Sequence, residues 1–136
     1  MNSRVLIADD DPDLREIIRL ALQRDGYDVI EAADGEQAVQ RAIESDPSLI
    51  LLDLVMPGPD GFDTCRRLKS DWRTLNVPII FISGQGDHRA RTKGLLLGAE
   101  DYVDKPFDPR DLGRRVRLAI QRRTIHSLFN DGSTSR

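Results

Sequence analysis

The chain has 136 residues, of which 39% are hydrophobic and 32% are charged, so it can form one domain with a single buried core. A formal net charge of −3 argues against an overall basic surface for nucleic acid, and the one cysteine, Cys65, excludes an intramolecular disulfide, as is usual in a reducing cytosol. No apolar run approaches the ~20 residues of a membrane helix, and the N-terminus lacks the pattern of a signal peptide. We therefore expect a cytoplasmic protein without a membrane anchor.

Five short segments predict strands. Three of them are rich in branched residues and apolar on both faces, which is typical of parallel strands that are covered on both sides. These three are RVLIA (Arg4–Ala8), SLILLDL (Ser48–Leu54) and VPIIFIS (Val77–Ser83). The run Tyr27–Ala32 alternates more and predicts a less buried strand, and Asp101–Asp104 predicts a short fifth strand.

Capping residues predict where five helices begin. In chain order, the starts are Asp11 with Pro12, Asp34 with Gln37, Asp60 with Gly61, Asp87, and Asp108 with Pro109. In the first helix the spacing predicts a buried apolar stripe of Leu14, Ile17, Ile18 and Ala21. Gly98 is expected to close the fourth helix. The fifth helix continues through RRTIHSLF, and the small polar tail NDGSTSR predicts a frayed end.

Strands and helices alternate strictly along the chain. This order predicts an α/β fold, in which helices cover both faces of a parallel sheet. Ligands in such folds bind beyond the carboxyl ends of the strands. The reactive side chains at these ends are Asp9, Asp10, Asp53, Ser83 and Lys105. We therefore expect three carboxylates, one hydroxyl and one ammonium to meet at one edge of the sheet.

These residue types indicate phosphoryl chemistry with a metal. Carboxylates that crowd together raise one another's pKa, and a divalent cation such as Mg²⁺, which prefers oxygen ligands, removes the conflict. With the cation and Lys105 offsetting charge, Asp53 on the middle strand can act as the nucleophile, and Ser83 can hydrogen-bond a phosphoryl oxygen. Asp11 and Asp13 are interpreted as helix-start residues.

Four segments in register resemble the receiver domain of two-component response regulators. They are ADDD after the first strand, DLVMPGPDG around Asp53, FISG at the fourth strand and GAEDYVDKPF at the fifth. The resemblance implies a flavodoxin-like (CheY-like) doubly wound sheet of five parallel strands, in the order 2-1-3-4-5, within three α/β/α layers. It assigns residues 1–123 to the receiver domain. It leaves 124–136 as a C-terminal tail or the start of a linker to an effector domain.

The resemblance also implies the site. Asp53 would accept a phosphoryl group from a sensor histidine kinase or a histidine phosphotransfer protein, and Lys105 would contact that group. Mg²⁺ or Mn²⁺ would be bound by Asp10, Asp53 and the Val55 carbonyl, with help from Asp9 through a water. The domain would assist its own phosphorylation and dephosphorylation without being a turnover enzyme.

A switch is implied as well. Ser83 would move toward the phosphoryl group, and Tyr102 would pack inward behind it. The face built from the fourth helix, the fifth strand and the fifth helix would then change its protein partners or form a homodimer. We expect no contact of this chain with nucleic acid or membrane, and the family further implies a cis Lys105–Pro106 bond.

Two alternatives stay open on the sequence alone. A phosphatase of the haloacid dehalogenase type would use Asp9 and Asp11 as its paired aspartates, but Asp13 stands where that motif has Thr or Val, and Asp53 would have no role. A pseudo-receiver would bind partners without phosphorylation, which the full acidic set and Lys105 disfavour.

Overall fold

Five strands and five helices alternate in the computed structural model, which describes residues 3–84 and 88–134. The strands are β1 (Arg4–Ala8), β2 (Asp28–Ala32), β3 (Leu49–Asp53), β4 (Ile79–Ser83) and β5 (Asp101–Asp104). The helices are α1 (Pro12–Arg24), α2 (Gly35–Ser45), α3 (Gly61–Lys69), α4 (His88–Leu96) and α5 (Pro109–Thr134). All neighbouring strands pair in parallel, in the order β2-β1-β3-β4-β5, which confirms the predicted doubly wound sheet.

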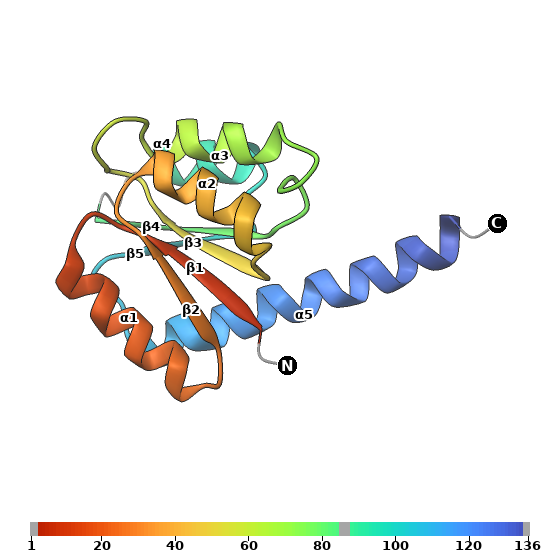
Figure 1. Cartoon of the computed structure of the whole chain (residues 1–136), viewed down its shortest axis with the longest axis horizontal. Helices are drawn as coiled ribbons and strands as arrows, with labels where there is room; N and C mark the ends of the chain where they lie inside the picture. Colours follow the sequence, from red (N-terminus) through yellow and green to blue (C-terminus); the bar gives the residue numbers. More distant parts are fainter. Residues whose placement is uncertain (1–2, 85–87, 135–136) are drawn as a thin grey trace.

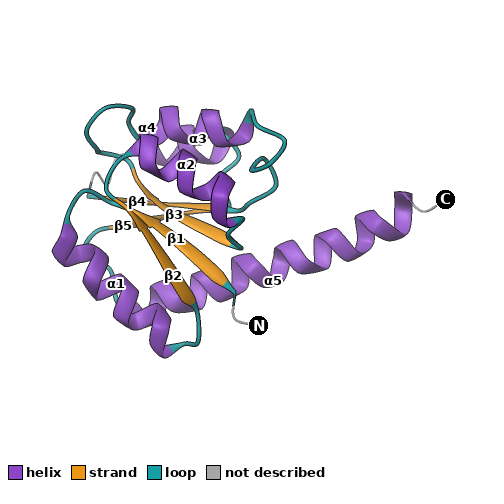
Figure 2. Ribbon diagram, in the orientation of Figure 1, coloured by secondary structure: helices purple, strands orange, loops and turns teal. Residues whose placement is uncertain are grey.

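The helices form two layers around the sheet. Helices α2, α3 and α4 cover one face, and α1 and α5 cover the other (Figures 1 and 2). Each face has its own apolar core, the first around Phe81 and Tyr102 and the second around Ile7 and Val116. Every residue of β3 and β4 is buried, because these strands lie inside the sheet and are covered on both sides, whereas the edge strand β2 is mostly half-buried.

Aspartates begin four helices as their sequence predicts. The carboxylates of Asp11, Asp34, Asp60 and Asp108 each accept a hydrogen bond from a backbone N–H in the first helical turn. The predicted start at Asp87 lies outside the described residues. Gly98 closes α4 with a left-handed φ of 101°, as expected for a glycine at this position.

The buried stripe of α1 differs from the prediction at one position. Ile18 is buried and Leu14 and Ala21 are partly buried, but Ile17 is 51% exposed and Leu22 takes its place in the core. Successive residues turn by about 100°, so Leu14, Ile18 and Leu22 follow one another at steps of about 40° around the helix, whereas Ile17 lies about 60° to the other side of Leu14. Ile17 is thereby left on the surface.

The C-terminal tail also differs from the prediction. Helix α5 does not fray after RRTIHSLF but continues to Thr134, and its second half projects away from the sheet and the other helices (Figure 1). Once its first half is anchored in the core, each further residue adds a hydrogen bond without a new nucleation cost. The projection leaves Ile125 and Leu128 exposed. Within the described part of the chain, no helix has the length and apolarity needed to cross a membrane.

We predict that Gly61→Ala destabilises the protein by about 2–4 kcal/mol, because a Cβ at this position would lie 2.4 Å from the Asp53 carbonyl oxygen and 2.7 Å from Leu54 Cα. Both neighbours are backbone atoms and cannot rotate away. Urea denaturation measures the loss. Gly84→Ala is the matched control, since its Cβ would meet no atom within 4 Å. An unchanged unfolding midpoint in Gly61→Ala would refute this packing constraint.

Candidate functional site

Three carboxylates gather at the carboxyl ends of β1 and β3. One oxygen from each of Asp9, Asp10 and Asp53 lies within 4.8 Å of the other two. The register explains this proximity. Ala8 of β1 pairs with Leu52 of β3, so the residues that follow them, Asp9 and Asp53, lie side by side. Asp9 and Asp53 are buried, whereas Asp10 is exposed. The predicted convergence at one sheet edge is confirmed for these three residues.

Lys105 reaches the same point from the end of β5. Its Nζ donates a hydrogen bond to Asp9 Oδ2 at 3.1 Å and lies 3.5 Å from Asp53 Oδ2. The Lys105 backbone N–H donates to the Ser83 carbonyl oxygen at 2.8 Å, which ties the ends of β4 and β5 together. The Lys105–Pro106 peptide bond is cis, as the family resemblance implied.

Burial makes ionisation of the Asp53 carboxyl group less favourable. Loss of water raises the pKa of Asp53 to about 6, and the neighbouring charge of Asp9 acts in the same direction, while Lys105 and the Val55 N–H partly oppose it. Burial alone would lower the pKa of Lys105, but the two carboxylates outweigh this effect and raise it. One ammonium therefore only partly offsets the negative charge at this edge.

Two hydrogen bonds hold Asp9 in place, and one of the donors, Arg15, was not predicted from the sequence. The Asp9 carboxylate accepts a hydrogen bond from the Asp11 N–H at 2.9 Å. The Arg15 guanidinium donates to the Asp9 carbonyl oxygen at 2.6 Å and to the Glu31 carboxylate at 3.1 Å. Arg15 lies one turn after the helix cap, and this position alone does not predict contacts with Asp9 and Glu31, which come from other elements.

Val55, Ser83 and Tyr102 are the remaining site residues that the sequence predicts. Val55 follows β3 with its side chain 59% exposed, and its N–H donates a long hydrogen bond of 3.4 Å to Asp53 Oδ1. Ser83 is fully buried at the end of β4, next to the exposed Gly84. Tyr102 is 1% exposed, and its ring packs 6.4 Å from that of Phe81. Tyr102 is thus buried in this structure, and its inward packing on phosphorylation stays a prediction.

The donor set suits a hard divalent cation. Carboxylate oxygens are the ligands that Mg²⁺ prefers, and here two of the three carboxylates are buried with a single ammonium to balance them. Among the residues that the structure describes, Asp9, Asp10 and Asp53 are the one group of His, Cys, Asp or Glu side chains close enough to share a metal ion. The site residues therefore fit the cation that the sequence predicts.

Asp11, which would be the second aspartate of a phosphatase of the haloacid dehalogenase type, has a different role in this structure. The Asp11 carboxylate is engaged as the cap of α1, where it accepts hydrogen bonds from the N–H groups of Asp13 and Leu14 at 3.0 and 3.4 Å. Asp53, which that alternative leaves without a role, instead lies at the centre of the acidic cluster. The geometry therefore does not favour a phosphatase of the haloacid dehalogenase type.

Comparisons with known proteins agree with this geometry. The model of the response regulator receiver domain family matches residues 5–117. The chain is 42% identical to the phosphate regulon transcriptional regulatory protein PhoB of Pseudomonas aeruginosa over 87% of its length. It is 37% identical to the transcriptional regulatory protein ResD of Bacillus subtilis over 94% of its length. It spans about half of these relatives, 52% of each.

Solved structures show the same fold. The receiver domain of the Francisella response regulator 1452 is 30% identical, with a TM-score of 0.83 over 89% of this chain and 98% of that one. The receiver domain of the sensor histidine kinase PA1611 from Pseudomonas aeruginosa is also 30% identical, with a TM-score of 0.82 over 89% of this chain and 99% of that one. That structure has a magnesium ion coordinated in its active site cleft. The chain belongs to the family of response regulator receiver domains.

Proposed function

We propose that Asp53 is the phosphoacceptor of this receiver domain and that a phosphohistidine on a sensor kinase or phosphotransfer protein is the donor. The observation that carries the proposal is the position of the Asp53 carboxylate, which is buried between Asp9 and Lys105 at the carboxyl end of the middle strand. A buried carboxylate beside a second carboxylate gives the fold no stability of its own, which supports a chemical role for Asp53.

The reaction is an exchange of one bond for another. An oxygen of ionised Asp53 attacks phosphorus, an O–P bond forms, and the N–P bond of the donor breaks with its electron pair going to the imidazole nitrogen. With a pKa of about 6, Asp53 is mostly ionised at neutral pH and is available as a nucleophile. The Lys105 ammonium, which already lies beside Asp53, offsets negative charge on the transferring group. Ser83 would hydrogen-bond a phosphoryl oxygen.

A divalent cation completes the proposed site. Asp9, Asp10, Asp53 and the Val55 carbonyl would hold Mg²⁺ or Mn²⁺, and when bound this ion supplies positive charge that offsets the phosphoryl oxygens. The chain's own part is to hold the Asp9 carboxylate by the Asp11 N–H and to fix the Asp9 backbone through Arg15. The same site would assist the later hydrolysis of the aspartyl phosphate.

The donor protein would cover an apolar groove beside Lys105. This groove has a volume of about 390 Å³ and is lined by Leu14, Ile17, Lys105, Pro106, Phe107 and Pro109. A protein that presents a phosphohistidine to Asp53 would lie against the residues around this groove, which form an apolar rim beside Lys105. Ile17, which is exposed on α1, offers that protein an apolar contact.

Output would pass through the face formed by α4, β5 and α5. Arg91 of α4 bonds Asp104 at 3.1 Å and lies 5.1 Å above the Tyr102 ring, so α4 and β5 are joined next to Lys105. Movement of Ser83 and Tyr102 on phosphorylation would change this contact and with it the preference for a downstream protein, an effector domain or a second copy. We place the protein in the cytoplasm, where such kinases present their donors.

Incubation with acetyl phosphate and Mg²⁺ should add the mass of one phosphoryl group to the intact protein. The addition should be lost in Asp53→Ala and reduced by at least about tenfold without the cation. Intact mass spectrometry measures both. Asp60→Ala is the matched control, because that aspartate caps α3 outside the acidic cluster. A modification that persists in Asp53→Ala would show that another residue is the phosphoacceptor.

Ile17→Asp should slow transfer from a histidine kinase by about tenfold while leaving the rate with acetyl phosphate unchanged, because it adds a charge to the apolar rim without touching Asp53. Rates from radiolabelled kinase and from acetyl phosphate give the comparison. Leu118→Asp on α5 serves as control, because Leu118 is likewise an exposed aliphatic residue but lies outside this groove. Equal slowing with both donors would mean that the substitution disturbs the site itself.

Asp53→Asn should raise the free energy of unfolding by about 2 kcal/mol at pH 7.5 in the presence of a chelator. The folded-state pKa of about 6 exceeds the ordinary value of 3.8, so ionisation of Asp53 destabilises the fold above pH 6. The gain should shrink as pH falls from 6 toward 4, where both states bind the proton. Mg²⁺ should stabilise the wild type more than the variant. Urea denaturation tests this, with exposed Asp28→Asn as control, and a variant less stable than wild type would contradict it.

A further inference from the structure

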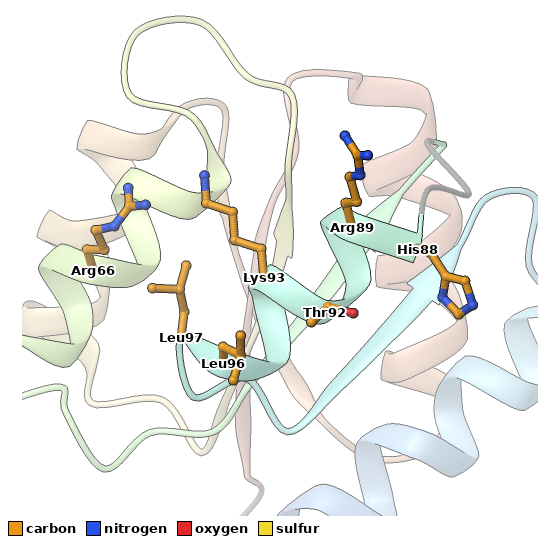
Figure 3. Close-up of a pocket in the computed structure, with 7 residues that line it drawn as sticks. All are labelled: Arg66, His88, Arg89, Thr92, Lys93, Leu96 and Leu97. Atoms are coloured by element: carbon orange, nitrogen blue, oxygen red, sulfur yellow. The ribbon is translucent and has the colours of Figure 1, made fainter.

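A groove of about 580 Å³ lies between α3 and α4 (Figure 3). Its lining residues are Arg66, His88, Arg89, Thr92, Lys93, Leu96 and Leu97. None of them belongs to the acidic cluster or to the apolar rim at Lys105. Lys93 of α4 and Leu97, the residue directly after α4, point toward α3, and Arg66 lies opposite them on α3 (Figure 3). The groove is therefore a surface that the proposed phosphotransfer does not use.

Helix α4 presents a helical stripe to this groove. Arg89, Thr92, Lys93, Leu96 and Leu97 follow the spacing i, i+3, i+4, i+7 and i+8, which places them on one side of a helix. The helix contacts the core through Gly94, where an added Cβ would lie 2.9 Å from the Phe81 ring, and through Ala90 and Leu97, which pack against the same core. Leu96 is 83% exposed. Arg89, Thr92, Lys93 and Leu96 are therefore exposed along the groove, while Leu97 joins this stripe to the core.

Positive charge surrounds the apolar part of the groove. The basic lining residues are Arg66, Arg89 and Lys93, and none of the seven lining residues is acidic. On α3, Asp63 pairs with Arg66 at 2.8 Å and offsets part of this charge, so basic residues still outnumber acidic ones along the groove and form a positive surplus. Lys93 lies with its Nζ 4.4 Å above the Phe62 ring, which holds its side chain along the groove. This surplus stands out on a chain whose net charge is −3.

We propose that the groove between α3 and α4 binds an acidic amphipathic helix of a partner protein. Aliphatic side chains of that helix would contact Leu96 and Leu97, and its carboxylates would face Arg66 and Lys93. A helix fits better than an extended strand, because the groove is walled by two helices and offers no free sheet edge for strand pairing.

Other occupants fit the groove less well. Nucleic acid would need a longer track of cations than these three residues provide, and the leucines give it no partner. A small ligand would need a closed pocket with buried polar groups, whereas Leu96 is almost fully exposed. In the protruding α5, Arg122 and Arg123 precede the exposed Ile125 and Leu128, so this segment of a second copy would bring positive charge to a groove that is already basic.

The proposal is tested with a synthetic helical peptide that carries leucines one turn apart and glutamates beside them. Its affinity for the unphosphorylated protein is measured by fluorescence anisotropy, and its site by amide chemical-shift changes. We expect saturable binding, shifts concentrated on α3 and α4, and weaker binding in high salt. The same peptide with lysine in place of glutamate should not bind. Because Asp53 is not phosphorylated in this measurement, its outcome is independent of the proposed phosphotransfer.

The double variant Lys93→Glu with Leu96→Asp should weaken binding by at least about tenfold. Both side chains are exposed, so the substitutions leave the core intact. The matched control is Arg122→Glu with Leu128→Asp on α5, which makes the same changes of charge and apolar surface outside the groove and should bind within about twofold of the wild type.

Three results would overturn the proposal. The first is no saturable binding of the acidic peptide by the wild type. The second is peptide binding that both double variants weaken equally, or that causes amide chemical-shift changes on α5 instead of α3 and α4. The third is self-association in sedimentation experiments that the Lys93→Glu and Leu96→Asp variant abolishes, because that result would assign the groove to a second copy of the chain.

Discussion

The structure depends on two carboxylates buried side by side at the ends of adjacent strands. Two full charges about 4 Å apart repel by roughly 4 kcal/mol at an effective dielectric constant near 20, so Asp9 and Asp53 need a positive partner. Lys105 provides part of it, and it can do so only because β5 lies beyond β4 and ends at the same edge. The sheet order and the cap of α1 thus maintain an arrangement that the fold alone would not favour.

The strands that end at the acidic cluster also carry the aromatic packing under α4. Phe81 lies two residues before Ser83, and Tyr102 lies three residues before Lys105. The Phe62 ring packs edge-on against Phe81 at 5.6 Å, and Phe81 packs against Tyr102. Because cores are close-packed, a shift of these strand ends must be accommodated by α4, which contacts the same rings through Gly94. The carboxyl ends of β4 and β5 are therefore joined to α4 by direct packing.

The sequence was sufficient for the sheet and for most of the acidic site. Strict alternation of strands and helices fixes which strand ends share an edge, so the meeting of Asp9, Asp53 and Lys105 follows from topology. The exposure of Ile17 did not follow, because an apolar residue on the flank of a helical stripe can face either the core or solvent. The role of Arg15 and the groove beside Lys93 depend on how side chains from separate elements meet, which no local pattern in the sequence encodes.

The opposite charges of the two sites also bear on which partner each can accept. An acidic helix is repelled from the edge that carries Asp9, Asp10 and Asp53, and from a chain of net negative charge in general. The groove around Lys93 and Leu96, by contrast, combines cations with an exposed leucine. Repulsion by the acidic edge would thus add to the attraction of the groove in setting the specificity of binding.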